Sequence, residues 1–265
     1  YLFVQSLAPT GEAMVAEPRS LSAFGFVQTD WTVRPDLRVN LGLRYDVERV
    51  SRVRGYDVPA DTDNLQPRVG VAWDLDGRGL TVVRGGVGLY SQQHLLYSIS
   101  RVQLEGVNGA VSLTLAPNSP SFPVFPAPLT ALPAGERPPR DIYRVAPDFR
   151  NPYSVQSTAG VQRAFAGGVL SADYVYLSGR DLVSLVDANA PAPLAKPASR
   201  TVDEADATRP VPPAVGGFRK ILTLGNRGRS WYHALEVKFD RTRGPLHLIA
   251  AYTRSRAEDM ANDAL

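Results

Sequence analysis

One pattern constrains this chain more than any other: apolar and polar residues alternate one by one through long stretches. In residues 37–48, LRVNLGLRYDVE, every odd position is apolar and every even position is polar or Gly. A period of two is typical of a β-strand whose two faces meet different surroundings. Such a stretch extends to about 40 Å, and a tilted strand of about 9 to 11 residues already crosses the apolar part of a bilayer. The pattern therefore favours a membrane-spanning strand, although soluble barrels and sandwiches also contain long strands.

The same alternation recurs along the chain and predicts an all-β protein with about nine strands. We find no convincing amphipathic helix pattern. The expected strands are the opening segment and residues 21–33, 37–48, 65–74, 81–90, 153–165, 169–177, 231–240 and 245–253.

Short and long connections alternate between these strands. Turns rich in Pro, Gly and Asp fall at residues 34–36, 74–79, 166–168 and 241–244, and longer loops at residues 9–19, 49–64, 91–152 and 178–229. Outer-membrane barrels have short periplasmic turns and long extracellular loops. We therefore predict an antiparallel transmembrane β-barrel. Because bacterial single-chain barrels close with an even strand number, about nine strands indicate part of a larger barrel.

Aromatic residues support the same interpretation, since those on the apolar face cluster near the two ends of the strands. Belts of this kind anchor barrels at both membrane interfaces. The apolar face would then meet outer-membrane lipid, and the opposite face a wet or plugged lumen. The lumen-facing charged residues would be Arg38, Arg44, Arg68, Arg84, Glu236 and Lys238. They could pair with plug groups or guide an anionic ligand. In a soluble sandwich the same face would simply be solvated.

Composition excludes several classes of function. The 265 residues include 29 Lys and Arg against 26 Asp and Glu, and the basic residues form no run, so nucleic acid is not an expected partner. The sequence contains no Cys, and its three His lack the spacing of a zinc site. No catalytic arrangement of Ser and His can be located, and the glycines of residues 85–88 fall inside a strand rather than at a helix start. We expect no metal, no cofactor and no enzymatic activity.

The loop at residues 117–152 is dense in Pro and cannot pair as a central strand. Long loops often carry recognition. Our hypothesis is that this loop and residues 178–229 contact a ligand through aromatic side chains, namely Phe122, Phe125, Tyr143 and Phe218. The alternative is that the loops merely cover the barrel mouth.

Four segments in series resemble the barrel of TonB-dependent outer-membrane receptors, most closely the Oar-like group. They are FGFVQTDWTVRPDLRVNLGLRYDVE, NLQPRVGVAWDLDGRGLTVVRGGVGLY, NPYSVQSTAGVQRAFAGGVLSADYVYLSGRDL and GNRGRSWYHALEVKFDRTRGPLHLIAAYTRSRAEDM. The resemblance implies that residues 1–265 are part of a single outer-membrane β-barrel domain. It also implies ligand uptake at the cell outer membrane, driven through a plug and TonB. The plug, the TonB-contacting segment and the remaining strands would lie outside this sequence, and the ligand is unknown.

Other functions fit the same sequence pattern. A plug-free, porin-like channel would move solutes passively, and a structural or adhesive surface barrel would use the wall only to mount its loops. An outer-membrane hydrolase lacks a site, and a soluble secreted all-β protein would need no lipid. A plug upstream would select the receptor.

Overall fold

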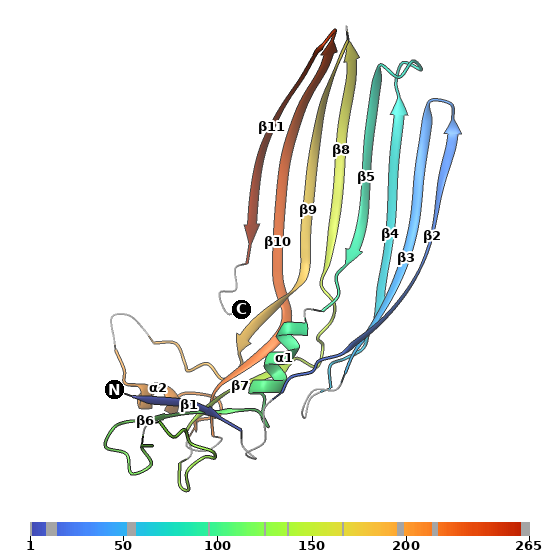
Figure 1. Cartoon of the computed structure of the whole chain (residues 1–265). Coiled ribbons are helices and arrows are strands. Elements are labelled where there is room, and N and C mark those ends of the chain that lie inside the picture. Colours follow the sequence, from blue (N-terminus) through green and yellow to red (C-terminus); the bar gives the residue numbers. More distant parts are fainter. Residues whose placement is uncertain are drawn as a thin grey trace.

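The computed structural model describes residues 2–8, 15–51, 57–94, 96–124, 126–136, 138–165, 167–194, 199–213 and 217–260. Eight long strands form a tall, curved antiparallel wall, and short elements gather at one end of it (Figure 1). The wall strands are β2 (Ser20–Arg34), β3 (Leu37–Val50), β4 (Asp61–Asp74), β5 (Thr81–Ser91), β8 (Tyr153–Phe165), β9 (Gly168–Asp187), β10 (Phe218–Arg243) and β11 (Leu246–Asp259).

We call the short elements at the lower end of Figure 1, with their connections, the cap. The cap contains β1 (Phe3–Leu7), α1 (Leu96–Glu105), β6 (Val111–Leu115), β7 (Arg140–Val145) and α2 (Val202–Ala207). The tight turns lie at the opposite end of the wall, where Gly167 and Gly244 have positive φ angles of 79° and 57° that suit glycine. The predicted alternation of short turns and long connections is therefore confirmed.

The sheet has nine strands in the described residues, but its membership differs from the prediction. The wall strands pair in the order β11-β10-β9-β8-β5-β4-β3-β2, and the ninth strand is β7, which runs parallel to β10. The opening segment does not join the wall, because β1 pairs with β6 in a separate two-stranded sheet. Its five residues alternate in burial, yet a strand this short cannot cross a bilayer.

Both boundaries of the loop predicted at residues 178–229 were wrong. β9 continues to Asp187, and β10 already begins at Phe218. β10 has 26 residues, which extend to roughly 85 Å. The register shifts twice near Gly225 and Gly228, and a Cβ on Gly228 would lie 2.9 Å from the Leu182 carbonyl oxygen. Such bulged, glycine-containing strands lose the simple alternation by which strands are recognised in sequence.

The cap also contains two short helices, for which the sequence shows no convincing amphipathic pattern. On α1, Ile99 and Val102 are completely buried, and Arg101 pairs with Glu105 one turn later at 2.9 Å. α2 begins with a capping box in which Thr201 and Glu204 bond reciprocally. Both helices are too short to give a strong periodic signal.

No helix in the described part of the chain has the length and apolar character needed to span a membrane.

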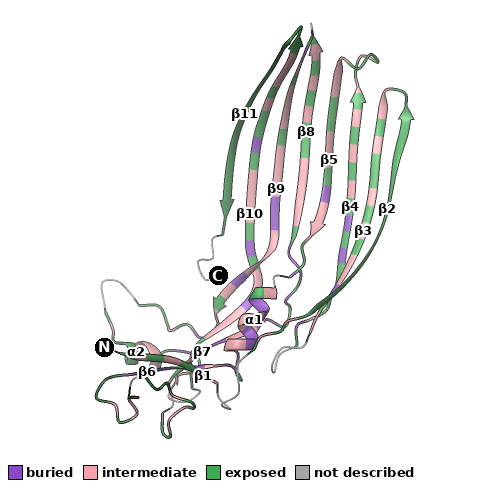
Figure 2. Ribbon diagram, viewed as in Figure 1, coloured by how far each residue is buried: buried purple, intermediate pink, exposed green. Residues whose placement is uncertain are grey.

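Buried residues concentrate in the cap half of the molecule (Figure 2). The main core cluster joins α1 and β7 to the base of the wall, with Val58, Ile99, Val102, Val145, Ala146, Phe149 and Leu224. A smaller cluster lies under the β1–β6 ribbon and contains Leu7, Leu113 and Leu115. The cap therefore has a core of the kind found in water-soluble domains.

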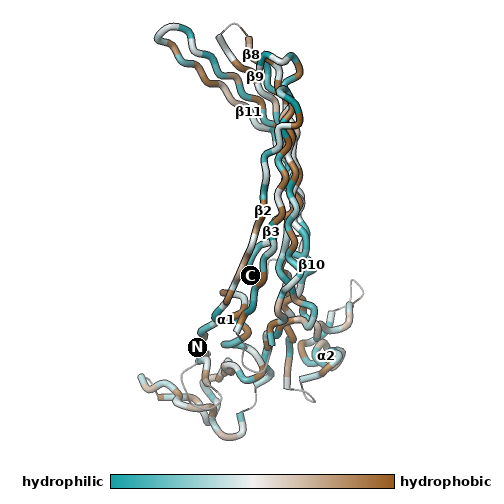
Figure 3. Tube along the Cα trace, turned by 90° about the vertical axis from the view of Figure 1, so that its right-hand side faces the viewer, coloured by the Kyte–Doolittle hydropathy of each residue, from teal (hydrophilic) through white to brown (hydrophobic). Residues whose placement is uncertain are grey.

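The wall shows the opposite arrangement. Along its strands, hydrophobic and hydrophilic residues alternate (Figure 3). The cross-strand register aligns most of the apolar residues on one face, which we call the apolar face and which includes Val27, Leu41, Leu43, Val69 and Val87. That face remains exposed: Leu43 and Trp73 leave 42% and 43% of their surface accessible. Continuous exposed apolar surface of this extent requires an apolar partner, and lipid supplies one.

Candidate functional site

The polar face of the wall holds the charged residues predicted from the sequence. The strand register places all six on one face, with Arg44 opposite Gln66, Arg68 opposite Gly88, and Glu236 opposite Asp173. Arg38 and Arg84 are both opposite Ala72, and Lys238 is opposite Ser171. Whether this face lines a lumen stays a prediction.

Several of these charges pair within the wall. Arg44 bonds Asp46 at 2.8 Å and stacks 4.1 Å from the centre of the Phe24 ring. Lys238 lies 3.3 Å from Asp240. Among the described residues, no ion pair joins Arg38, Arg68 or Glu236 to a partner of opposite charge. The polar face therefore combines internal pairs with unpaired charges.

The strongest pair on this face spans a complete strand. Arg84 on β5 makes two bonds to Asp173 on β9, at 3.0 and 2.8 Å. β8 lies between them, and Gly160 is the cross-strand partner of both residues. A Cβ at Gly160 would lie 2.0 Å from the Asp173 carboxylate. The ion pair can cross β8 because Gly160 has no side chain.

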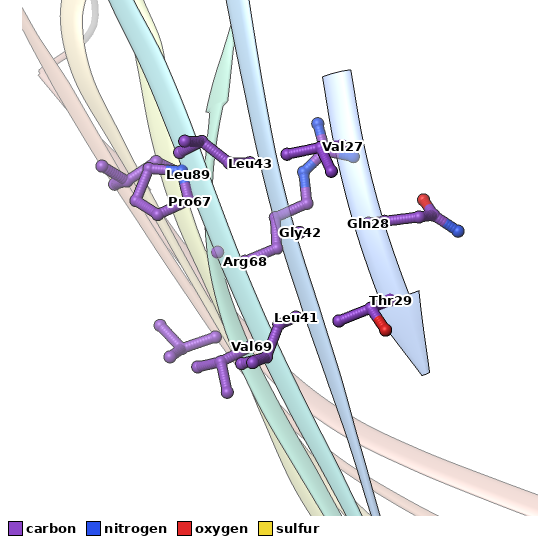
Figure 4. Close-up of a pocket in the computed structure, with 12 residues that line it drawn as sticks. Val27, Gln28, Thr29, Leu41, Gly42, Leu43, Pro67, Arg68, Val69 and Leu89 are labelled. Atoms are coloured by element: carbon purple, nitrogen blue, oxygen red, sulfur yellow. The ribbon is translucent and has the colours of Figure 1, made fainter. Parts of the chain in front are cut away.

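A depression of about 540 Å³ lies on the apolar face between β2 and β5 (Figure 4). Its side chains include Val27, Leu43, Pro67, Val69 and Leu89. It contains almost no polar group that could fix the orientation of a solute. We interpret it as part of the lipid-contacting surface rather than as a ligand site.

A buried polar network fastens the cap to the wall. One Glu48 carboxylate oxygen accepts from the Ser20 hydroxyl at 2.6 Å, and the other accepts from the His94 backbone N–H at 3.0 Å and the Asn151 side-chain amide at 2.9 Å. Asp61, beside Glu48 on the next strand, accepts from the Asn151 backbone N–H at 2.5 Å. Both carboxylates are at least 95% buried. The long connection between β5 and β8 is thus tied at both ends to β3 and β4.

His94 belongs to this network through its backbone N–H, whereas its ring makes no hydrogen bond to any described residue. The ring stacks on Phe149 with centroids 4.7 Å apart. Burial lowers the pKa of His94, although the nearby Glu48 and Asp61 charges act in the opposite direction. The folded cap therefore favours a neutral imidazole.

A cavity of about 670 Å³ lies within the cap, and we call it the cap cavity. Hydroxyl groups line it on the side of the β1–β6 ribbon, and arginines line it on the side of β7 and β10. Those residues are Ser6, Ser112, Thr114, Arg140 and Arg219. Buried Asn189 positions the start of β10, because its side-chain amide donates to the carbonyls of Phe218 and Arg219 at 3.3 and 3.1 Å.

The aromatic residues predicted to contact a ligand do not share one site. Phe122 packs edge-on against Phe3, with ring centroids 6.0 Å apart. The Tyr143 hydroxyl accepts from Arg101 at 2.8 Å, and burial raises its pKa. Phe218 begins β10 and pairs with Arg140 on β7, and Phe125 lies outside the described residues. The recognition hypothesis for these residues stays a prediction.

The sequence analysis missed Arg140, Arg219 and the three hydroxyl residues. Two of the elements that hold them had a sequence signal: the opening segment, predicted as a strand, forms β1, and VSLTL, which forms β6, alternates strictly. These signals could have identified the ribbon, but nothing in the sequence brings it near the arginines. Among the described residues, no group of three or more His, Asp and Glu is arranged to hold a metal ion.

The fold and the two faces of the wall define a class: a segment of a transmembrane β-barrel. A family model described as an outer membrane beta-barrel domain matches residues 51–265, and the chain belongs to this family. It is accordingly an outer-membrane protein. No curated protein sequence matches the chain.

Solved structures with a similar fold include one transporter and two receptors. The FrpB iron transporter of Neisseria meningitidis has a TM-score of 0.55 at 14% identity, with 93% of this chain and 27% of that chain covered. The siderophore receptor PirA of Acinetobacter baumannii has a TM-score of 0.52 at 14% identity, covering 92% and 28%. The ferripyoverdine receptor of Pseudomonas aeruginosa has 0.50 at 11%, covering 93% and 24%.

The chain thus spans about a quarter of the length of these proteins. The expected resemblance to TonB-dependent receptor barrels is confirmed at the level of the fold, whereas no comparison tests the Oar-like group. These neighbours are transporters and receptors, in agreement with the expectation of a non-enzymatic protein.

Proposed function

We propose that this chain is part of the barrel of an energy-coupled receptor that takes up a small ligand across the outer membrane. In this proposal, residues 1–265 belong to one barrel domain. The plug, the segment that contacts TonB and the remaining strands come from other parts of the protein. The ligand enters from the cap side and passes along the polar face.

One observation carries the proposal. The wall has an exposed apolar face suited to lipid, the cap lies at the end where the long connections are, and the two outer strands, β2 and β11, have no neighbour on their outer side in the described residues. β2 and β11 are exposed along their whole length, and open sheet edges are not stable inside a bilayer. Further strands must therefore complete the wall. A wall of eight strands that still needs neighbours supports a large barrel, such as those of the iron and siderophore receptors with this fold.

Uptake by whole cells tests the proposal. A strain that lacks the full-length protein and its complemented form would be supplied with radiolabelled ferric siderophores and ferric citrate, with and without an intact tonB gene. We expect the protein to raise accumulation only when TonB is present. Accumulation that persists without TonB would indicate a porin-like channel, and no effect of the protein on accumulation would favour a structural or adhesive barrel.

One deletion and one pair of charge reversals test which residues contribute to this function. Removing residues 117–139 from the full-length protein should reduce uptake if the Pro-rich loop contributes to recognition; unchanged uptake would refute that role.

Reversing the charges of Arg68 and Arg84 should lower barrel stability or transport. If both remain at the level of the unmodified protein, these two arginines neither pair with plug groups nor guide an anionic ligand.

A further inference from the structure

The β1–β6 ribbon has two chemically different faces. On β6, Val111, Leu113 and Leu115 are buried, whereas Ser112 and Thr114 between them are exposed. Ser6 on β1 is the cross-strand partner of Ser112, so its hydroxyl lies on the same face. Apolar side chains of the ribbon form the smaller core cluster, and its hydroxyl groups line the cap cavity. The cavity thus has a wall of hydrogen-bonding groups.

Arg140 lies across the cavity from this ribbon without a carboxylate partner in the described residues. One terminal nitrogen of its guanidinium donates to the carbonyls of Gly106 and Gly109, at 3.1 and 3.0 Å. Its Nε has no partner, and burial lowers the pKa of Arg140 because no carboxylate offsets the desolvation. A partly buried cation without a counter-charge is costly unless an anion comes close to it.

Arg219 adds a second cation to the same cavity. Its Nε forms an ion pair with Asp206 at 3.8 Å and makes no hydrogen bond to any described residue. Two carboxylates line the cavity as well, but they are already engaged. Glu105 accepts one hydrogen bond from Arg101 at 3.1 Å and forms an ion pair with the same guanidinium, and Asp141 accepts from the Lys220 backbone N–H. Among the described residues, Arg140 is therefore the cation of the cavity that has no ion-pair partner, and its free Nε can donate to a ligand.

We propose that the cap cavity binds a small, oxygen-rich organic anion, with its carboxylate against Arg140 and Arg219 and its other oxygens against Ser6, Ser112 and Thr114. The volume of about 670 Å³ lies in the range of small-molecule sites, which is roughly 300 to 1,000 Å³. Arginine forks suit carboxylates, and hydroxyls suit the remaining oxygen atoms. The inference deepens the proposed function and rests on it, since it names the chemical class of the ligand.

Calorimetry on the full-length protein in detergent tests the inference with defined probes. Citrate and gluconate are the organic anions, inorganic phosphate is the plain anion, and sorbitol is the neutral polyol. We expect citrate or gluconate to bind more tightly than phosphate and sorbitol. R219Q should weaken binding about tenfold or more, because a charge-assisted hydrogen bond is lost.

Two further variants protect the test against misfolding. S112L replaces an exposed hydroxyl by an apolar group that fills the cavity, and it should abolish binding while the core side of the ribbon stays unchanged. R78Q removes a charge in the turn between β4 and β5, at the opposite end of the wall, and should bind like the unmodified protein. Arg140 is unsuitable as the sole variant because it also holds the turn after α1.

Several results would overturn the inference. The first is that neither citrate nor gluconate binds. The second is that sorbitol or phosphate binds as tightly as both organic anions. The third is that R219Q and S112L bind the anions as the unmodified protein does. The assay needs neither TonB nor an energised membrane, so its failure is separable from that of the proposed function. Binding without TonB-dependent uptake would refute energy coupling and leave the cavity assignment intact; uptake without binding would do the reverse.

Discussion

Ile99 in the cap is completely buried, whereas Leu41 on the wall leaves 43% of its surface exposed. Both are large aliphatic residues in regular secondary structure, but the first is covered by other protein side chains and the second is not. The cap excludes water by packing its own helix and strand against the base of the wall. On the wall, the apolar face has no protein partner in the described residues, and a bilayer must supply one. One chain thus combines a hydrophobic core that is buried within the protein and an apolar surface that is suited to contact lipid.

The polar groups of the two regions differ in the same way. In the cap network, Glu48 and Asp61 are buried and hydrogen-bonded by residues far apart in the sequence. On the wall, Arg84 and Asp173 pair on an open face, where Arg84 is 47% exposed. The buried network should therefore be sensitive to the loss of one partner, while the exposed pair contributes little by its charge alone.

The largest expected effect is local loss of the cap core. I99A should cost about 2 to 5 kcal/mol, because truncating a fully buried aliphatic side chain leaves a cavity. Hydrogen exchange of the full-length protein should show faster exchange in α1 and β7 and unchanged exchange in β3 and β4. The control Y97A lies on the same helix at a 65% exposed position. Equal loss of protection along the wall would contradict independent stabilisation of the two regions.

A charge on the apolar face should be nearly as costly. L41R is expected to destabilise the wall by about 2 to 4 kcal/mol near the bilayer midplane, because the guanidinium would face lipid. The neighbouring substitution N40R places the same group on the polar face, beside Asp30, and should be tolerated. Urea unfolding of the full-length protein in lipid vesicles measures both. Similar stability of the two variants would show that the apolar face does not contact lipid.

The strand-crossing ion pair should give a smaller effect. G160A introduces a methyl group where Asp173 now lies, and we expect a loss of about 1 kcal/mol, since the pair is exposed and water screens it. G25A is the matched control, because a Cβ at Gly25 meets nothing within 4 Å. The same unfolding assay applies. If both variants unfold at equal urea concentrations, the Gly160 gap is not required for the Arg84–Asp173 pair.

The smallest effect should appear as a pH dependence of the cap. Because the pKa of His94 is lowered in the folded state, the unfolded cap binds more protons below about pH 6.5, and cap stability falls as the pH drops through that range. Hydrogen exchange of α1 should accelerate accordingly. H94F keeps the stacking on Phe149 and removes the titration, so its exchange should depend less on pH. An unchanged pH profile in H94F would show that His94 does not cause the effect.

The sequence alone predicts the strands and turns of the wall, because alternation at period two follows directly from a sheet with one face in lipid and one in a polar environment. The residues at 37–48 form β3 as expected, and the short turns fall where Pro, Gly and Asp cluster. The bulged start of β10 escaped prediction, since Gly225, Gly228 and the charges around them read as a loop.

The sequence by itself determined that the chain forms a two-faced sheet, which residues occupy each face and where the sheet turns. Only the tertiary structure decided that β1 leaves the wall to pair with β6, that Gly160 clears a path for an ion pair, and that Ser112 faces the cavity of Arg140 and Arg219. The physical reason is range. Strand faces and turns depend on neighbours along the chain, whereas some of these contacts join residues more than a hundred positions apart, and no local pattern records them.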